Sequence, residues 1–355
     1  MNARHIFQHK YFAPGIGCLF FLLIAAVPSL LILVGASGGG IVQLDVMNKI
    51  GIATALALSL NIILGQTGLF HMGHTAFFAV GAYTSAILNT VYQWPVFSTM
   101  PVAGLFAAVF ALAVALPIIH LRGDYLLVVT IGIVEIVRIC LMNNIFGLTG
   151  GANGIFGIAR PAMFGLTFST PRLQYYLIWG FTGITVFLFY LLEHSRFGRA
   201  LNYIKHDDLA AAGCGINVAR YKLIAFTLGA FWAGMAGTLY AANIRSIEPT
   251  SFNFFESVIL FAIVILGGSG SICGVIVGAF LLIGLQDLFR DFNSARMLVF
   301  GAAMVLMMIF RPQGLLPARN RRYDARKYLG KFSCAIGRQC ATAYSPYAED
   351  EGDQP

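Results

Sequence analysis

Two oppositely charged residues, Glu135 and Arg138, lie inside an apolar stretch of this chain. They are three positions apart, so on a helix they share one face and can form an ion pair. A charge at the centre of a bilayer costs about 2.5–3.5 kcal/mol on insertion scales, so such groups are normally paired or line a polar cavity. The pair therefore predicts either the wall or gate of a transport pathway, or a structural ion pair. We expect no other oppositely charged pair at membrane depth.

Other polar side chains near or within the apolar stretches are candidates for the same pathway. Each could contact a substrate, although a single polar group in such a place more often makes a hydrogen bond between helices. The candidates are Asn61, Gln66, His71, His74 and Thr130.

A glycine-rich segment lies in the loop 146–173, which we place on the outer side of the membrane. Glycine adopts backbone conformations that are closed to other residues. The segment therefore predicts an outer gate or a contact for a solute-binding protein, with a flexible connector as the alternative. The residues concerned are Gly150, Gly151, Asn153 and Gly154.

The sequence offers no candidate for catalysis by the chain itself. It contains no G-x-x-x-x-G-K-[ST] pattern, so it has no P-loop with which to cradle ATP. We find no nucleophile–base arrangement and no metal-ligand spacing, and we predict no catalytic residue, no metal and no cofactor.

The composition places the chain in a membrane. Of its residues 58% are apolar and only 11% are charged, and the mean hydropathy is +0.78. Several apolar runs reach the roughly 18–20 residues that cross the hydrocarbon. We predict an all-α polytopic protein with about ten transmembrane helices, some of them broken or re-entrant. The predicted spans are 15–35, 46–64, 70–89, 102–121, 125–145, 174–192, 222–242, 255–267, 272–289 and 296–310.

Two of these spans have unusual features. The second and the eighth are short or interrupted by glycine, which is typical of broken or re-entrant helices, and such half-helices survive only inside protein. Glycine-rich breaks at 65–68 and 267–270 follow them, which suggests a faint internal repeat.

The first span resembles a signal peptide, but its apolar run is longer than usual and we interpret it as retained.

The basic residues predict the orientation. They are concentrated in the N-terminal tail 1–13, the loop 193–221 and the tail 317–355, which favours both termini on the cytoplasmic side. The net charge of +8 therefore reflects topology and does not indicate nucleic acid. Residues 319–338 could also lie on anionic lipid, and the tail as a whole is predicted to be largely disordered. The transmembrane permease domain would cover 14–316.

The cytoplasmic loop 193–221, which we call the coupling loop, is longer than a connection between two spans requires. Residues 198–204, including Arg199, are expected to continue the sixth helix. Asp207 or Asp208 can cap a new short helix at 209–212, which Gly213 or Gly215 would end. Ala210 and Ala211 leave almost no side chain, so the groove of another protein could close over the backbone. The alternative is an ordinary helical hairpin.

This loop resembles the cytoplasmic EAA loop of ABC-importer permeases. Ala210-Ala211-x-x-x-Gly215 fits the pattern Glu-Ala-Ala-x-x-x-Gly, although Leu209 occupies the Glu position. Over residues 44–317 the chain resembles the LivM-type permeases of branched-chain amino acid importers, and urea-type permeases are close relatives. The motifs are Gly65–His74 with Gly81–Tyr83, Leu121–Tyr125, Thr149–Gly154, Gly215–Asn217 and Arg311–Leu316.

The resemblance implies an inner-membrane permease subunit of a bacterial ABC importer for branched-chain or related amino acids. Its partners would be two P-loop ATPases, a second homologous permease and an extracytoplasmic solute-binding protein. The binding protein would set most of the specificity, which leaves this chain as a permissive conduit. Urea or short amides remain alternative substrates. A self-sufficient secondary transporter is the rival class, and the docking-like loop with Asp207, Asp208 and Asn217 counts against it.

Overall fold

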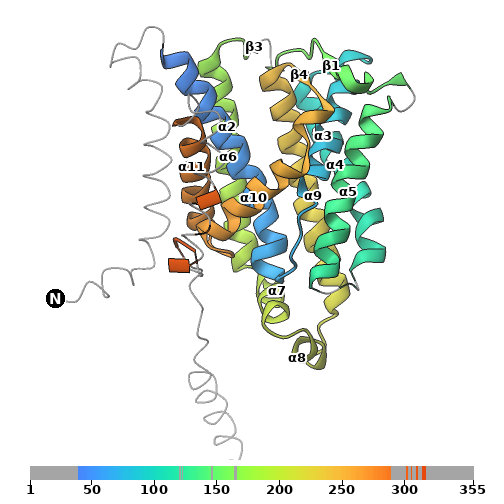
Figure 1. The fold of residues 1–355 in the computed structure, drawn as a ribbon, viewed down its shortest axis with the longest axis vertical. Helices are drawn as coiled ribbons and strands as arrows, with labels where there is room; N and C mark the ends of the chain where they lie inside the picture. The colour runs from blue at the N-terminus through green and yellow to red at the C-terminus, as the bar shows by residue number, and fades with distance from the viewer. Residues whose placement is uncertain are drawn as a thin grey trace, which may run out of the picture. The chain divides into compact units, whose positions relative to one another are not determined.

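The computed structural model describes residues 39–119, 121, 123–144, 147–163, 166–288, 301–302, 305, 309–310 and 314–316. They form a helical bundle with short strands at one end and the helices α7 and α8 at the other (Figure 1). The larger helices are α2 (Gly39–Asn61), α3 (His74–Thr90), α4 (Val96–Ile118), α5 (Asp124–Met142), α6 (Pro171–His194), α7 (Arg196–His206), α8 (Asp208–Gly213), α9 (Val218–Ile244), α10 (Phe254–Gly267) and α11 (Ile272–Leu288).

Shorter elements connect them. A π-helix η2 (Ile62–Gln66) continues α2, and two 3₁₀ turns are η4 (Gly151–Asn153) and η5 (Pro249–Ser251). Strand β1 (Ile155–Phe156) pairs antiparallel with β4 (Ser246–Ile247), and β2 (Ala162–Met163) pairs antiparallel with β3 (Leu166–Thr167).

The observed helices match most predicted spans, but ten spans are not established. Six helical segments within the described ranges are long and apolar enough to cross a membrane. The predicted spans 15–35 and 296–310 lie largely or wholly outside the described residues. The prediction of a short or broken second span is wrong, because α2 runs without interruption into η2. The third helix begins at His74 instead of residue 70.

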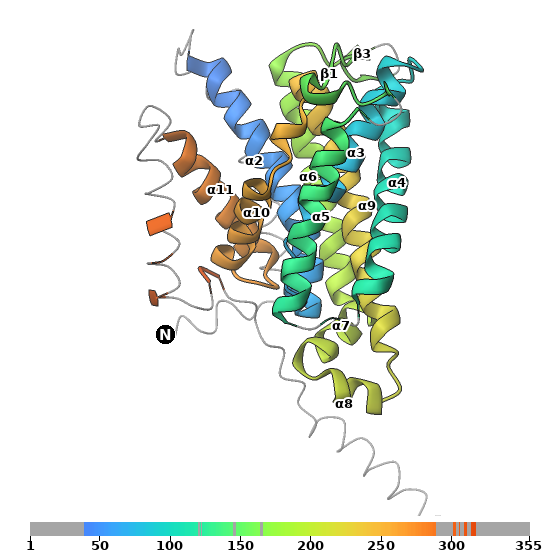
Figure 2. The ribbon, with the colours of Figure 1, turned by 45° about the vertical axis from the view of Figure 1, so that its right-hand side comes forward.

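Three apolar helices are each shorter than the hydrocarbon is thick. At about 1.5 Å per residue, the 17 residues of α3, the 17 of α11 and the 14 of α10 cover less than a hydrocarbon core of about 30 Å. Helix α10 reaches the length of a candidate span only together with η5, as Pro249–Gly267. The Ser257 hydroxyl donates to the Thr75 hydroxyl at 2.7 Å, which joins the first turns of α10 and α3. Figures 1 and 2 show α10 beginning partway along the bundle, below β1 and β4.

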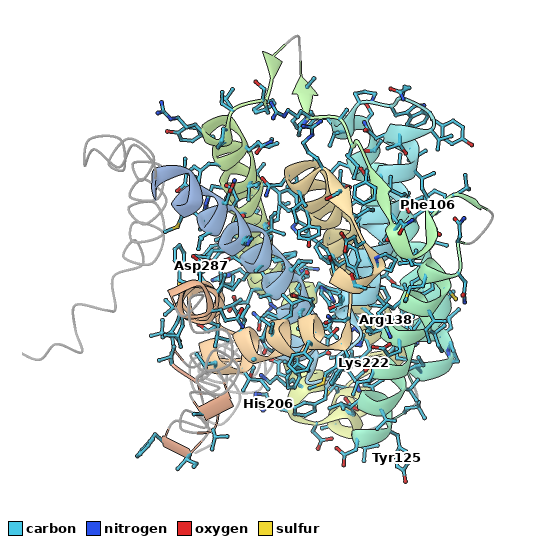
Figure 3. All side chains as sticks on the ribbon, turned by 45° about the horizontal axis from the view of Figure 1, so that its top comes forward. Phe106, Tyr125, Arg138, His206, Lys222 and Asp287 are labelled. Atoms are coloured by element: carbon cyan, nitrogen blue, oxygen red, sulfur yellow. The ribbon has the colours of Figure 1, made fainter. Side chains whose placement is uncertain are left out.

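Helix α9 is the centre of the bundle, because it packs against α2, α3 and α4. Small residues make these contacts close: Gly81 on α3 meets the backbone of Gly234 on α9, which in turn meets Ala107 on α4. Such seams of small residues are how membrane helices approach without a hydrophobic driving force. By contrast, one face of α4 carries exposed apolar side chains such as Phe106, as expected for a surface in lipid (Figure 3).

Candidate functional site

The coupling loop folds as two capped helices. The Ser195 side chain accepts a hydrogen bond from Gly198 N at 3.2 Å and so begins α7. The expectation that residues 198–204 continue the sixth helix is therefore wrong, because Ser195 takes an extended conformation that ends α6 and caps α7. The predicted short helix is confirmed: the Asp207 carboxylate accepts from the N–H groups of Leu209 and Ala210.

The end of this second helix also follows the sequence prediction. Gly215 has φ +81°, in the left-handed region that favours glycine, and the chain turns there into α9. The Asn217 side chain then accepts from Arg220 N at 3.1 Å and caps α9.

The two alanines of the motif differ in their surroundings. Ala211 is buried against the core of its own chain, whereas Ala210 is exposed. The nearby Leu209 is 75% exposed and Tyr203 is 53% exposed. Arg199 is exposed as well, so the free surface of the loop combines apolar and basic side chains. A docking surface is therefore available at Ala210 but not at Ala211.

Two lysines anchor the loop to the membrane helices. Lys222, at the start of α9, forms an ion pair with Asp208 at 2.6 Å (Figure 3). Lys205 Nζ donates to the carbonyl oxygen of Gly65 at 2.7 Å, which links α7 to η2. Burial lowers the pKa of the Lys205 ammonium below its usual value. These two contacts tie α7 and α8 to the helices of the bundle.

The two glycine-rich breaks noted in the sequence meet in space. The Asn61 side-chain oxygen accepts from Gly270 N at 2.8 Å, and a methyl group on Gly65 would collide with both residues. Asn61 is therefore a structural bridge in this conformation. The side-chain oxygen of neighbouring Gln66 is buried without a hydrogen-bond partner among the described residues.

The histidines and Thr130 surround the linker between η2 and α3. His74 Nε2 lies 2.7 Å from the Ser59 hydroxyl, and the Thr130 hydroxyl accepts from Met72 N at 3.2 Å. His71 is buried against Phe77 and His74, and neither of its ring nitrogens has a partner in the described part of the chain. His74 and Thr130 thus hold the linker in place, whereas His71 has unused hydrogen-bonding capacity.

Glu135 and Arg138 pair with each other on α5. The carboxylate and guanidinium lie 2.8 Å apart, and their side chains are 35% and 28% exposed. They occupy a flank between the buried face of Val134 and Val137 and the exposed face of Ile136 and Ile139. The pair is self-neutralised, which suits a structural role and also the wall of a polar pathway.

The sequence reasoning passed over further charges within the candidate spans. Asp45 and Lys49 lie within Leu44–Gln66, and Glu256 lies within Pro249–Gly267. The ion pairs found among the described residues are Glu135–Arg138 and Asp208–Lys222.

The glycine-rich segment 150–154 is a packed turn. Gly150, Gly151 and Gly154 all have positive φ, of 71°, 61° and 77°, and a methyl group on Gly154 would collide with the Ile247 carbonyl. Asn153 lies in η4, which packs beside η5. The segment is therefore fixed against the turn that leads into α10.

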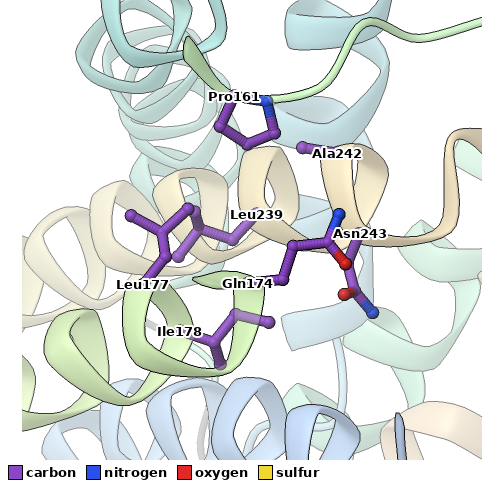
Figure 4. A pocket seen from close by; sticks show the side chains of 7 residues that line it. All are labelled: Pro161, Gln174, Leu177, Ile178, Leu239, Ala242 and Asn243. Atoms are coloured by element: carbon purple, nitrogen blue, oxygen red, sulfur yellow. The ribbon is translucent and has the colours of Figure 1, made fainter. Parts of the chain in front are cut away.

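A small pocket lies between α6 and α9, lined by Pro161, Gln174, Leu177, Ile178, Leu239, Ala242 and Asn243 (Figure 4). It has room for about one water molecule, which is too little for an amino acid. The pocket is not a substrate site in this conformation.

Comparisons with known proteins agree with this architecture. A family model described as a branched-chain amino acid transport system permease component matches residues 42–308. The permease protein LivM of Escherichia coli K12 is 41% identical over 296 residues, covering 77% of this chain and 69% of its own. LivM of Salmonella typhimurium is 40% identical over 298 residues, covering 78% and 70%. The ribose import permease RbsC of E. coli K12 is 28% identical over 262 residues, covering 72% and 66%.

No solved structure matches the chain. The family match covers most of the sequence, and the LivM relatives share two fifths of their aligned residues with it. The chain therefore belongs to the family of branched-chain amino acid transport system permease components.

Proposed function

We propose that the chain is the membrane-spanning subunit of an ATP-driven importer that carries branched-chain amino acids into a bacterial cell. The observation that carries this proposal is the likeness to LivM proteins, whose names give branched-chain amino acid transport, over 77% of the chain. The six candidate spans support the inner membrane as its location.

The importer needs partners that supply what this chain lacks. Because the sequence has no P-loop, ATP binding falls to two cytoplasmic ATPases. A second homologous permease would complete the pathway, and an extracytoplasmic binding protein would deliver the amino acid. In this arrangement both termini of the chain are cytoplasmic.

The coupling loop is the proposed ATPase contact. Its exposed residues Arg199, Leu209 and Ala210 would contact the ATPase, while Asp207, Gly215 and Asn217 shape the two turns that present α8. When the ATPases close on ATP, α8 would move with them. The Asp208–Lys222 ion pair and the Lys205–Gly65 hydrogen bond would then carry this motion to α9 and η2.

Reconstitution tests the proposal directly. The chain is placed in proteoliposomes with the second permease, ATPases and binding protein encoded beside its gene, and uptake of radiolabelled leucine is measured with ATP inside. We expect uptake that requires ATP and the binding protein. ATP-dependent uptake of urea or acetamide, without uptake of leucine, would show that the importer carries short amides and not branched-chain amino acids. Uptake by the chain alone, driven by an ion gradient, would overturn the whole assignment.

A further inference from the structure

Helix α5 lies at the edge of the bundle and is weakly covered by the rest of the chain (Figure 1). It packs chiefly against α3 and the turns η4 and η5. It is the least buried of the candidate spans in the described chain, with 28% of its apolar window buried, against 39% for α4 and for α6. Much of α5 therefore faces outward.

The outward strip of α5 is apolar. It carries side chains that are 50–77% exposed, namely Tyr125, Val128, Ile136 and Ile139. On a helix with 3.6 residues per turn, these positions fall within about 80° of one another. They form one continuous face, which either lipid or another membrane helix could cover.

The flank of this strip is charged. Glu135 and Arg138 are the twelfth and fifteenth of the 19 residues of α5, so they lie near the middle of the span. Both side chains remain partly exposed, and Glu135 lies about 40° around the helix from Ile139. Because contact with hydrocarbon is costly for a charged group, such residues normally face protein or a water-filled cavity. This flank of α5 therefore does not face lipid.

The charged pair neutralises itself but keeps hydrogen-bonding capacity. Arg138 Nε and Nη2 both lie 2.8 Å from the same carboxylate oxygen, Glu135 Oε2. The other oxygen of Glu135 accepts no hydrogen bond from the described residues. Arg138 Nη1 reaches the sulfur of Met142 at 3.6 Å, which is a weak acceptor. A polar group from outside the chain would complete these contacts.

Helices α4 and α6 differ from α5 in this respect. Helix α4 contains no charged residue, and the acidic and basic residues of α6, Arg172 and Glu193, stand at its two ends. Phe106 on α4 is 56% exposed, similar to the 50% of Ile139 on α5. Of these three weakly buried spans, α5 alone combines an exposed face with charges in mid-span.

We propose that the outward face of α5, with Glu135 and Arg138 on its flank, is the contact surface for the second permease. This inference rests on the proposed function, which supplies that partner. The ATPases and the binding protein lie outside the membrane, so the second permease is the component of the importer that reaches the depth of Glu135. One of its helices packs along Val128, Ile136 and Ile139, and a polar side chain on that helix donates to the second oxygen of Glu135.

Photocrosslinking in the assembled importer tests this contact. The residue p-benzoylphenylalanine, which on illumination attaches to groups beside it, replaces Ile139 in one variant and Phe106 in the matched control. The importer is assembled in nanodiscs from this chain, the second permease and the ATPases, and the crosslinked products are identified by mass spectrometry. We expect a crosslink from position 139 to the second permease, and adducts with lipid alone from position 106.

Three results would overturn the interface. Adducts with lipid alone from position 139 would show that this face lies in the bilayer. A crosslink from position 139 to another copy of this chain would identify a different partner. Crosslinks to the second permease in equal yield from both positions would show that the contact is not particular to α5.

A bulky substitution provides an independent measurement. Ile139→Trp and Phe106→Trp both alter exposed side chains, so the amount of the chain in the membrane should stay the same. An overpacked contact weakens association by about tenfold, so Ile139→Trp should lower copurification of the second permease by that factor. Phe106→Trp should leave copurification unchanged, and equal copurification with the two variants would contradict the interface.

Leucine uptake by the unmodified importer with its binding protein is measured separately. Absence of that uptake would refute the transport function. Normal uptake without a crosslink from position 139 to the second permease refutes only the α5 interface.

Discussion

Lys205 Nζ donates a 2.7 Å hydrogen bond to the carbonyl oxygen of Gly65, across 140 residues of sequence. Gly65 lies in the last turn of η2, where carbonyl groups have no partner within the helix. A cation at a helix C-terminus is also favoured by the helix dipole. The lysine therefore caps the membrane helix from the coupling loop.

Replacing Lys205 by methionine should uncouple ATP hydrolysis from transport. Methionine keeps the length and apolar stem but cannot donate, and a hydrogen bond to a charged group contributes about 1.5–3 kcal/mol. We expect leucine uptake in proteoliposomes to fall by about tenfold while the ATPase rate of the same complex changes less than twofold.

Two controls accompany this variant. Lys205→Arg keeps a cationic donor and should retain part of the uptake, and His206→Ala alters an exposed neighbour and should transport normally. If uptake and ATP hydrolysis fall in parallel for Lys205→Met, the lysine is needed to keep the complex assembled and does not transmit motion from the ATPases to the pathway.

The two alanines of the docking motif should respond differently to arginine. Ala210 is exposed, so Ala210→Arg should leave the amount of folded permease unchanged and reduce copurification of the ATPases. Ala211 is buried, and overpacking costs about 1–3 kcal/mol, so Ala211→Arg should lower the melting temperature of the permease itself. Normal copurification and uptake with Ala210→Arg would exclude this surface as the contact.

Cys214 offers a native probe of the orientation. It is exposed between α8 and α9. With the other five cysteines replaced by serine, it should resist a membrane-impermeant maleimide in right-side-out vesicles and react in inverted ones. Asn202→Cys on α7 should behave in the same way. Labelling of either position from outside would reverse the topology and remove the ATPase contact.

The Glu135–Arg138 pair can be classified by a double-mutant cycle. Arg138→Ala leaves the carboxylate alone, at a cost below the about 3–5 kcal/mol of a fully buried pair because both side chains are partly exposed. If the pair is structural, adding Glu135→Ala should recover thermal stability and uptake together. Recovery of stability without uptake would assign the pair to the pathway, and wild-type behaviour of both single variants would remove it from either role.

Gly65→Ala should disturb the junction of the two glycine-rich breaks. The added methyl group would collide with Asn61 and Gly270, whose hydrogen bond joins the end of α2 to the turn before α11. We expect a loss of about 1–3 kcal/mol, seen as a lower melting temperature. Gly132→Ala on α5 is the matched control, because a methyl group there meets nothing within 4 Å. Equal melting temperatures for the two variants would contradict the tight junction.

The sequence by itself determined the class of the protein and the local form of the coupling loop. Long apolar runs locate α5, α6 and α9 within a few residues, because hydropathy and helix length are local properties. The start of α4 at Val96 was placed too late, at residue 102. The Asp207 cap and the left-handed Gly215 were also predictable, since capping depends on residues next to each other in the chain.

Only the tertiary structure decided which distant residues meet. Helix α3 begins at His74, and the linker before it is held by a hydrogen bond from Met72 N to the Thr130 hydroxyl on α5. Because this partner is distant in the sequence, the apolar pattern alone placed the start of α3 too early. The contacts of Lys205 with Gly65 and of Asn61 with Gly270 join segments more than a hundred residues apart. The close approach of Gly81 on α3 to the backbone of Gly234 on α9 also depends on the packing of whole helices, which no local pattern encodes.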